Sequence, residues 1–186
     1  MFFYALFFSS GIFAQRIDVD SLKRSALSQM SAGRSGEAID QLNKYISAVP
    51  QEAEAYNLRG VCFERRQEYP NARLDYRRAV ALETNPTKRS QYEDNLRRLT
   101  ETWYAILNKR IEGRLREIAI NPNNAYNYLE IGKSYYYMED WAKAEQWYDD
   151  YLSRDDNASA DEIIRYSEVL AKTGSITKGE QVLKIC

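Results

Sequence analysis

The feature that most constrains this chain is a pattern of small and large apolar residues that recurs about every 34 residues. With Val19, Ala53, Ala125 and Ala160 as repeat starts, the first two starts lie 34 residues apart and the last two 35. A unit of this length forms a helix-turn-helix that cannot bury its apolar face alone, so it must stack on a neighbour. The pattern therefore predicts an all-α protein built from stacked helix pairs, and it favours a binding surface over a catalytic centre.

The repeats agree position by position. The second repeat has Tyr56, Gly60, Phe63, Ala72, Tyr76 and Ala79, and the third has, at the same offsets, Tyr128, Gly132, Tyr135, Ala144, Tyr148 and Tyr151. The first repeat has Leu22, Ala26, Ala38, Leu42, Tyr45 and Pro50, and the fourth has Ile163, Ser167, Leu170, Gly179, Leu183 and Cys186. The matching offsets indicate that all four segments form the same kind of helix pair.

This spacing resembles the tetratricopeptide repeat family, in which small residues stand where two helices cross closely and bulky residues fill the gap to the next repeat. The resemblance implies a right-handed superhelical solenoid over residues 19–186. Its repeats are residues 19–52, 53–86, a degenerate repeat at 87–124, 125–159 and a partial repeat at 160–186. In two places the chain departs from the family pattern: Gln29 replaces a large apolar residue, and Thr84 stands where Pro is usual.

Turn residues support this division. Gly33 lies between the two halves of the first repeat, and Glu139-Asp140 and Thr173-Gly174 occupy the matching places in the later repeats. A helix has to stop and reverse at such points, where Gly and small polar residues are favoured. Pro122 marks a boundary between repeats because proline cannot continue a helix.

The segment 87–124 has weaker punctuation. We interpret it as a degenerate repeat with one helix ending near Leu107 and a second helix running to about Ile120. The alternative is one continuous helix, because only Asn108 and Gly113 interrupt the pattern in its middle.

Residues 1–14 are strongly apolar and carry no charge. A helix of this length spans about 21 Å, less than the roughly 30 Å of a hydrocarbon core, so a membrane span is disfavoured. The segment resembles the apolar region of a secretory signal peptide with a candidate cleavage point after Ala14, although no basic residue precedes Arg16. We therefore expect an exported protein, periplasmic or extracytoplasmic, that meets a membrane only through this segment if it is not cleaved and serves as an anchor.

Charge and composition argue against several classes of ligand. The formal net charge is -1, so no general attraction to nucleic acid is expected. Arginines do cluster in residues 65–78, but they are interleaved with acidic residues, and a solvated helix face explains them. No small-molecule substrate is indicated either.

Catalytic and metal-binding patterns are also missing from the sequence. There is no histidine, the commonest general base and metal ligand. Cys62 and Cys186 have no partner at metal-ligand spacing, and we expect two free thiols. No Gly-rich phosphate loop is present. We therefore predict a protein that is not an enzyme and needs no cofactor or metal.

The remaining candidate is a recognition surface. The resemblance implies that the first helix of each repeat lines a concave groove, and it places these partner-binding candidates there: Lys23, Asn57, Glu64, Arg65, Tyr126, Leu129, Lys133, Tyr136, Tyr137 and Lys172. Tyrosine supplies a large contact area with a polar tip at low entropy cost. Packing of these rings into the gaps between repeats explains them equally well.

One subset of the family grips a peptide's terminal carboxylate with Lys and Asn. Lys23 and Asn57 match part of that set, but Leu27 stands where a second Asn is expected, so carboxylate capture is not implied. The sequence thus predicts a protein-protein interaction scaffold that binds an extended peptide or a partner helix in a concave groove. The alternative is the accessory repeat region of a larger enzyme or of a secretion or assembly component whose activity lies beyond Cys186.

Overall fold

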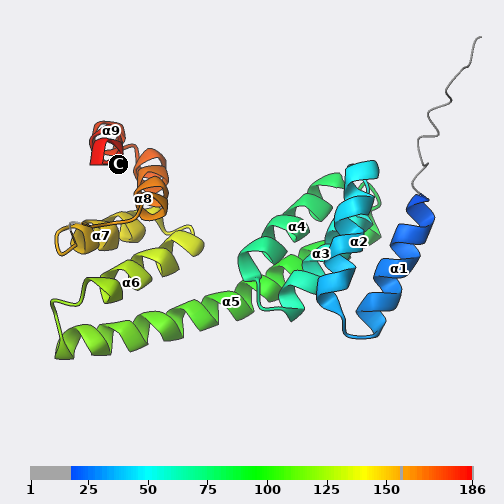
Figure 1. Ribbon diagram of the computed structural model, residues 1–186, viewed down its shortest axis with the longest axis horizontal. Helices are drawn as coiled ribbons and strands as arrows, with labels where there is room; N and C mark the ends of the chain where they lie inside the picture. Colours follow the sequence, from blue (N-terminus) through cyan, green and yellow to red (C-terminus); the bar gives the residue numbers. More distant parts are fainter. Residues whose placement is uncertain (1–17, 156, 186) are drawn as a thin grey trace, which may run out of the picture. The chain divides into compact units, whose positions relative to one another are not determined.

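The computed structural model describes residues 18–155 and 157–185, and over these residues it is helical, with no strand (Figure 1). The expected signal segment at residues 1–14 lies outside the described residues. The helices in chain order are α1 (Val19–Ser31), α2 (Ser35–Ala48), α3 (Ala53–Arg65), α4 (Tyr69–Leu82), α5 (Pro86–Ile120), α6 (Ala125–Tyr137), α7 (Trp141–Leu152), α8 (Ala160–Thr173) and α9 (Ile176–Val182), followed by the 3₁₀ helix η1 (Leu183–Ile185).

The chain divides into two compact units. The N-terminal unit ends at Leu96 and contains α1 to α4 with the start of α5, whereas the C-terminal unit begins at Arg97 and contains the rest. Within each unit the helices pack in consecutive pairs: α1 with α2 and α3 with α4 in one, α6 with α7 and α8 with α9 in the other. Contacts of α2 with α3 and of α7 with α8 join the pairs. The predicted all-α fold built from helix pairs is confirmed.

Glycines mark the close crossings inside two of the pairs. A Cβ atom on Gly60 would lie 2.8 Å from the Tyr76 ring, and one on Gly132 would lie 3.2 Å from Tyr148 Cδ2. Both tyrosines are completely buried. A side chain at Gly60 would force the Tyr76 ring to shift, and one at Gly132 would push Tyr148 away by a few tenths of an ångström, as the small-and-bulky spacing of the repeat pattern predicts.

The four turns inside the helix pairs share one backbone conformation. Gly33 (φ 75°), Gln67 (φ 61°), Glu139 (φ 62°) and Gly174 (φ 82°) are all left-handed. A left-handed backbone is unfavourable for residues with a Cβ, yet it occurs at the equivalent turn of every helix pair. The predicted turns at Gly33, Glu139 and Gly174 are confirmed, and Gln67 supplies the fourth.

Side-chain caps define several helix starts. Asp18, Asn124 and Asp140 each accept a hydrogen bond from a backbone N–H in the first turn of the helix that follows. Ser159 and Glu162 form a reciprocal capping box at the start of α8. The caps at Asp18, Asn124 and Ser159 fix where the first helix of a repeat begins, and the cap at Asp140 fixes the start of a second helix.

The segment after Pro86 is one helix of 35 residues, so the interpretation of two helices meeting near Leu107 was wrong. Its buried residues Tyr92, Leu99, Trp103, Leu107 and Ile111 follow at intervals of seven or four. That spacing keeps a single stripe on one side of an unbroken helix. Gly113 adds a cost of only about 1 kcal/mol relative to Ala, which is too small to end the helix.

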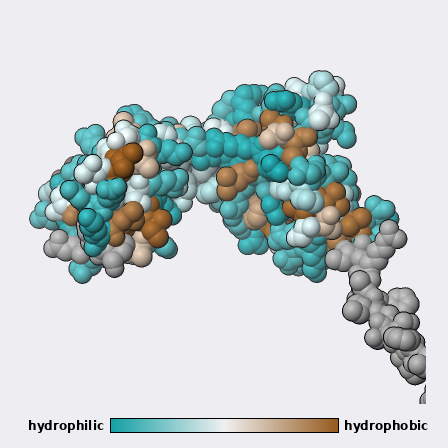
Figure 2. Space-filling model, turned by 90° about the horizontal axis from the view of Figure 1, so that it is seen from above, coloured by the Kyte–Doolittle hydropathy of each residue, from teal (hydrophilic) through white to brown (hydrophobic). Residues whose placement is uncertain are grey.

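The surface seen in Figure 2 is mostly hydrophilic and carries small hydrophobic areas. Among the described helices, none combines the length and the apolar character needed to cross a membrane.

Candidate functional site

In the N-terminal unit, the predicted groove residues already have partners within the chain. Lys23 Nζ lies 2.6 Å from Glu54 Oε2 and 3.4 Å from Glu52 Oε1. Burial lowers the pKa of Lys23, but the hydrogen bond to Glu54 and the two negative charges outweigh it, and the net shift is upward. This ion pair connects α1 with the start of α3.

The other three candidates of this unit behave in the same way. Asn57 Oδ1 accepts from Asn95 Nδ2 at 3.0 Å, and the Glu64 carboxylate accepts from the Tyr76 hydroxyl at 2.7 Å. Arg65 donates to the backbone oxygen of Met30 at 2.9 Å. All these contacts join neighbouring helices, so this part of the predicted surface serves the packing of the repeats.

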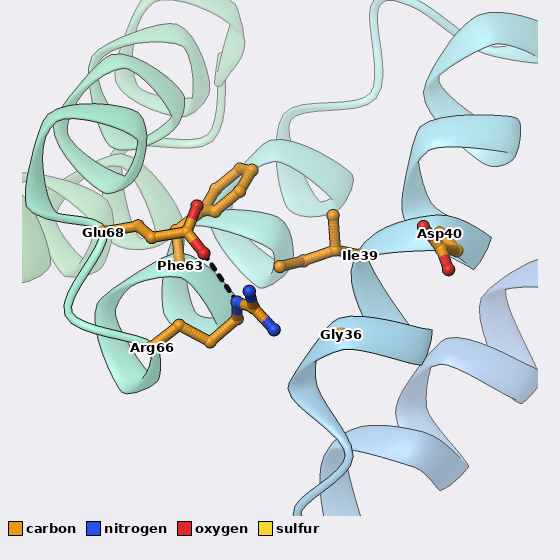
Figure 3. A pocket seen from close by; sticks show the side chains of 6 residues that line it. All are labelled: Gly36, Ile39, Asp40, Phe63, Arg66 and Glu68. Atoms are coloured by element: carbon orange, nitrogen blue, oxygen red, sulfur yellow. Dashed lines mark hydrogen bonds and ion pairs between the residues drawn. The ribbon is translucent and has the colours of Figure 1, made fainter.

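The N-terminal unit has a hollow of about 260 Å³ between α2 and the turn after α3 (Figure 3). Ile39 and Phe63 give it apolar walls, and the Arg66 guanidinium lies at its edge, 2.6 Å from Glu68 Oε1. The exposed Arg66 guanidinium is therefore already paired within the chain, and Asp40 adds a carboxylate to the lining of the hollow.

In the C-terminal unit the candidate tyrosines belong to an aromatic cluster of Trp103, Tyr136, Tyr137 and Trp141. The ring centroids of Trp103 and Tyr137 are 5.3 Å apart. Tyr136 meets Tyr137 edge-on at 5.5 Å and Trp141 edge-on at 5.7 Å. Such pairs are worth about 0.5–1.5 kcal/mol beyond burial. The cluster therefore contributes packing, while Tyr136 and Tyr137 keep part of their surface accessible.

Arg165 of α8 lies over this cluster. Its guanidinium is 5.3 Å from the centroid of the Tyr136 ring and 5.7 Å from that of Tyr137. The side chain is half-buried, and no carboxylate of the described residues forms an ion pair with it. Burial lowers the pKa of Arg165, but the hydroxyls of Tyr137, Tyr148 and Tyr136 outweigh this effect. Arg165 is thus a permanent, partly desolvated cation held by aromatic faces.

Two tyrosine hydroxyls complete this environment. The Tyr136 hydroxyl donates to Glu168 Oε2 at 2.7 Å, and burial together with this bond raises the pKa of Tyr136 to about 12. Tyr148 Oη is buried and has no hydrogen-bond partner among the described residues. Burial raises the pKa of Tyr148, with Arg165 opposing the shift. Both hydroxyls therefore stay protonated at neutral pH.

An open hollow of about 320 Å³ lies over this arrangement and is lined by Tyr136, Asp161, Ile164, Arg165 and Glu168. It combines one cation, two carboxylates, an aromatic ring and an aliphatic side chain. This mixture suits a peptide better than a compact apolar ligand, because a peptide carries both charges and a polar backbone. We call this hollow the arginine site.

The other candidates of this unit lie around it. Lys133 Nζ is 3.6 Å from both Glu130 Oε1 and Glu162 Oε1. Lys172 is exposed and lies over the Trp141 ring.

Two more candidates lie nearer the start of α6. Tyr126 is half exposed beneath the Arg114 guanidinium. Leu129 is only 4% exposed and belongs to the hydrophobic core, so it is not a contact residue.

Arg165, Trp103 and Trp141 were not among the residues predicted from the sequence. Arg165 stands in the first helix of a recognised repeat, 35 residues after Glu130, so its repeat position was readable. Its lack of a carboxylate partner was not readable, because that depends on which side chains α6 brings next to α8.

No group of three or more metal-ligating side chains occurs in the part of the chain that the structure describes. Cys62 is a buried free thiol, and burial raises its pKa, with Arg65 opposing. A buried thiol with a raised pKa is a poor nucleophile.

Comparison with known proteins identifies the repeats. The tetratricopeptide repeat family model matches residues 24–87, which is most of the first two repeats. No curated protein matches the sequence.

The solved structures that match the chain share little sequence with it. The MamA fragment 41-end from Desulfovibrio magneticus RS-1 is 12% identical, with 90% of this chain and 92% of that one covered and a TM-score of 0.43. YrrB, described as a TPR protein with an unusual peptide-binding site, is 14% identical, with 90% and 84% covered and a TM-score of 0.41.

A third similar structure is the first TPR of Spaghetti (RPAP3) bound to the HSP90 peptide SRMEEVD. It is 16% identical, with 84% of this chain and 93% of that one covered and a TM-score of 0.34. Residues 24–87 thus match the tetratricopeptide repeat family, and the small-and-bulky pairing of Gly60 with Tyr76 inside that match recurs outside it at Gly132 and Tyr148.

Proposed function

We propose that this protein is a non-catalytic interaction scaffold whose arginine site binds an extended peptide that carries a carboxylate. The observation that carries the proposal is Arg165, a half-buried guanidinium held by two tyrosine rings and left without a carboxylate partner among the described residues. Such a cation has lost part of its hydration, and aromatic faces replace that hydration only in part. A carboxylate from a ligand would complete the site.

The geometry of the hollow favours a peptide. A carboxylate can accept two parallel hydrogen bonds from a guanidinium, which gives direction as well as affinity. Asp161 and Glu168 border the same hollow, so a basic residue near the ligand's carboxylate finds partners as well. Tyr136 adds an accessible ring edge of the kind that dominates binding hot spots.

The test is selection from a randomised peptide library of about twelve residues displayed on phage, against the unmodified protein. Selected peptides should contain Asp, Glu or a free C-terminal carboxylate. Their Kd should rise at least tenfold, about 1.4 kcal/mol, for Arg165→Gln and less for Arg165→Lys, which keeps the charge but loses the planar fork. Arg116→Gln, an exposed arginine of α5, is the matched control and should leave Kd unchanged. Peptides without acidic groups, or equal binding by Arg165→Gln, would contradict the proposal.

Tyrosine variants separate binding from packing. Tyr136→Phe removes only the hydroxyl that donates to Glu168, so it should change peptide affinity with little change in the melting temperature. Tyr137→Ala removes a ring that packs on the buried Trp103, so it should lower stability by more than about 1.5 kcal/mol. If Tyr137→Ala melts like the unmodified protein but binds weakly, this ring is a contact residue and the packing role assigned to it is wrong.

For localisation, we propose that residues 1–14 direct export, on the strength of their apolar and uncharged sequence. Expressed from Met1 in a cell with a secretory pathway, the protein should be recovered either without this segment or bound to the membrane by it. N-terminal sequencing of the cell fractions measures this directly. A soluble cytoplasmic product with Met1 intact would remove the proposal.

A further inference from the structure

A third hollow, of about 410 Å³, lies between α8 and α9, and we call it the end groove. Its apolar lining includes Ile164, Ala171, Ile176 and Leu183, and Glu168 and Glu180 are its acidic residues. Ile164 is 58% exposed, Ile176 63% and Leu183 48%, so several large apolar side chains meet solvent on one small surface. Exposed apolar residues are ordinary when scattered, but a grouped set marks an interaction surface.

The repeat register shows which surface of the preceding helix pair corresponds to the end groove. Moving back 35 residues takes Glu168 to Lys133, Ala171 to Tyr136, Ile176 to Trp141 and Leu183 to Tyr148. The α6–α7 pair therefore carries an equivalent surface.

In the α6–α7 pair this equivalent surface is covered by a helix, namely α8. Each of its four residues contacts one residue of α8. Lys133 Nζ lies 3.6 Å from Glu162 Oε1, and the Tyr136 hydroxyl donates to Glu168 Oε2 at 2.7 Å. Lys172 Nζ lies 5.9 Å from the centroid of the Trp141 ring, and the stacked rings of Tyr148 and Tyr166 have centroids 5.4 Å apart. The protein itself thus shows what this kind of surface accepts. It accepts one amphipathic helix.

The same contacts define the chemistry that an occupant of the end groove needs. On α6–α7, acidic Glu162 meets basic Lys133. In the end groove the corresponding residue is acidic Glu168, so the occupant needs Lys or Arg at this position. Four residues later in α8, Tyr166 stacks on Tyr148, whose counterpart is Leu183, so the occupant needs a large apolar residue there.

We propose that the end groove binds an amphipathic helix of a partner protein, with Lys or Arg at one position and a large apolar residue four positions later. The negative charge of Glu168 and Glu180 selects the basic helix, and the apolar residues supply the buried area. The end groove shares Ile164 and Glu168 with the arginine site, but Arg165 does not line it, so the inference does not depend on the proposed peptide site.

The chain supplies its own probe. A synthetic peptide with the sequence of residues 160–173 carrying Glu162→Lys, held helical by a hydrocarbon staple on its exposed face, presents the required pattern. The same stapled peptide with Glu162 unchanged is the matched control, because its carboxylate would face Glu168. Fluorescence anisotropy with the full chain should show at least tenfold tighter binding of the Glu162→Lys peptide.

Protein variants locate the binding. Ile176→Glu should weaken the Glu162→Lys peptide at least tenfold, whereas Ile120→Glu, the same change at an isoleucine that is 80% exposed on α5, should not. Glu168→Lys should reverse the preference between the two peptides, with the melting temperature checked because Tyr136 loses its acceptor. Arg165→Gln should have no effect, which separates this site from the arginine site.

Three results would overturn the inference. The first is equal or absent binding of the two peptides, and the second is binding that Ile176→Glu leaves unchanged. The third is a concentration-dependent dimer in sedimentation velocity that Ile176→Glu converts to monomer, because the occupant would then be a second copy of the chain.

Discussion

The ring of Tyr76 lies so close to Gly60 that a Cβ atom on this glycine would stand 2.8 Å from both Cδ1 and Cε1 of the ring. Real Cβ atoms do not approach other atoms this closely, and Tyr76 is completely buried, so the ring has no free space into which to move. The crossing of α3 and α4 therefore depends on the absence of one methyl group.

Gly60→Ala should destabilise the protein by about 1–3 kcal/mol because it overpacks this crossing. Gly113→Ala is the matched control: nothing lies within 4 Å of its added Cβ, and in a helix interior the change should stabilise by about 0.5–1 kcal/mol. Urea unfolding measures both. Shifts of the same sign and size would contradict the assigned repeat register.

Gln67→Gly should stabilise the protein. Gln67 holds φ at 61°, a left-handed conformation that costs a residue with a Cβ roughly 1 kcal/mol and costs glycine nothing. The opposite change at the equivalent turn, Gly33→Ala, should destabilise by a similar amount, since no atom lies within 4 Å and only the backbone effect remains. Chemical denaturation distinguishes the two, and a loss of stability in Gln67→Gly would show that the turn tolerates its side chain without strain.

Removing one partner of the ion pair between Arg59 and Asp75 should strongly lower the stability of the protein. The guanidinium donates twice to the carboxylate, at 2.7 and 2.8 Å, and Asp75 is 5% exposed. Asp75→Ala should cost about 3–5 kcal/mol because it leaves a cation largely buried and unpaired. The double variant Arg59→Met with Asp75→Leu should recover much of the loss. In a double-mutant cycle, additive effects of the two sites would mean that they do not interact.

Stability should fall in acid partly through Glu162. Burial raises the pKa of this carboxyl, but hydrogen bonds from the Ser159 backbone and the Tyr151 hydroxyl, with the charge of Lys133, outweigh it and hold the pKa below its ordinary value. A lowered folded-state pKa gives stability that is present above the unfolded value of about 4.3 and is lost as pH falls through the folded value. The stability difference between the unmodified protein and Glu162→Gln should therefore shrink below about pH 4. A difference independent of pH would show that the charge of Glu162 contributes nothing.

The repeat architecture could be predicted from the sequence because it depends on local spacing. Gly60 and Tyr76 stand 16 residues apart in one repeat, and Gly132 and Tyr148 stand the same distance apart in another. Small and bulky residues at these offsets are compatible with one way of crossing two helices, so the pattern alone identified the pairs and most of their turns.

The continuity of α5 could not be predicted in the same way. Within this helix Asn108 and Gly113 are weak helix breakers, and a buried stripe from Tyr92 to Ile111 outweighs them. Burial of that stripe depends on helices elsewhere in the chain. Its effect was therefore not visible in the local pattern.

Which residues of the predicted groove are available to a partner depends almost entirely on the tertiary structure. From repeat position, Lys23 and Leu129 were equally good groove residues, yet the fold pairs Lys23 with Glu54 and places Leu129 in the core. Arg165 was not among the residues predicted from the sequence, and within the part of the chain that the structure describes no carboxylate forms an ion pair with it. The spacing of small and bulky residues within a helix pair is a local property, so it can be predicted from the sequence. The pairing of a charge is a property of distant side chains, and only the packed structure brings them together.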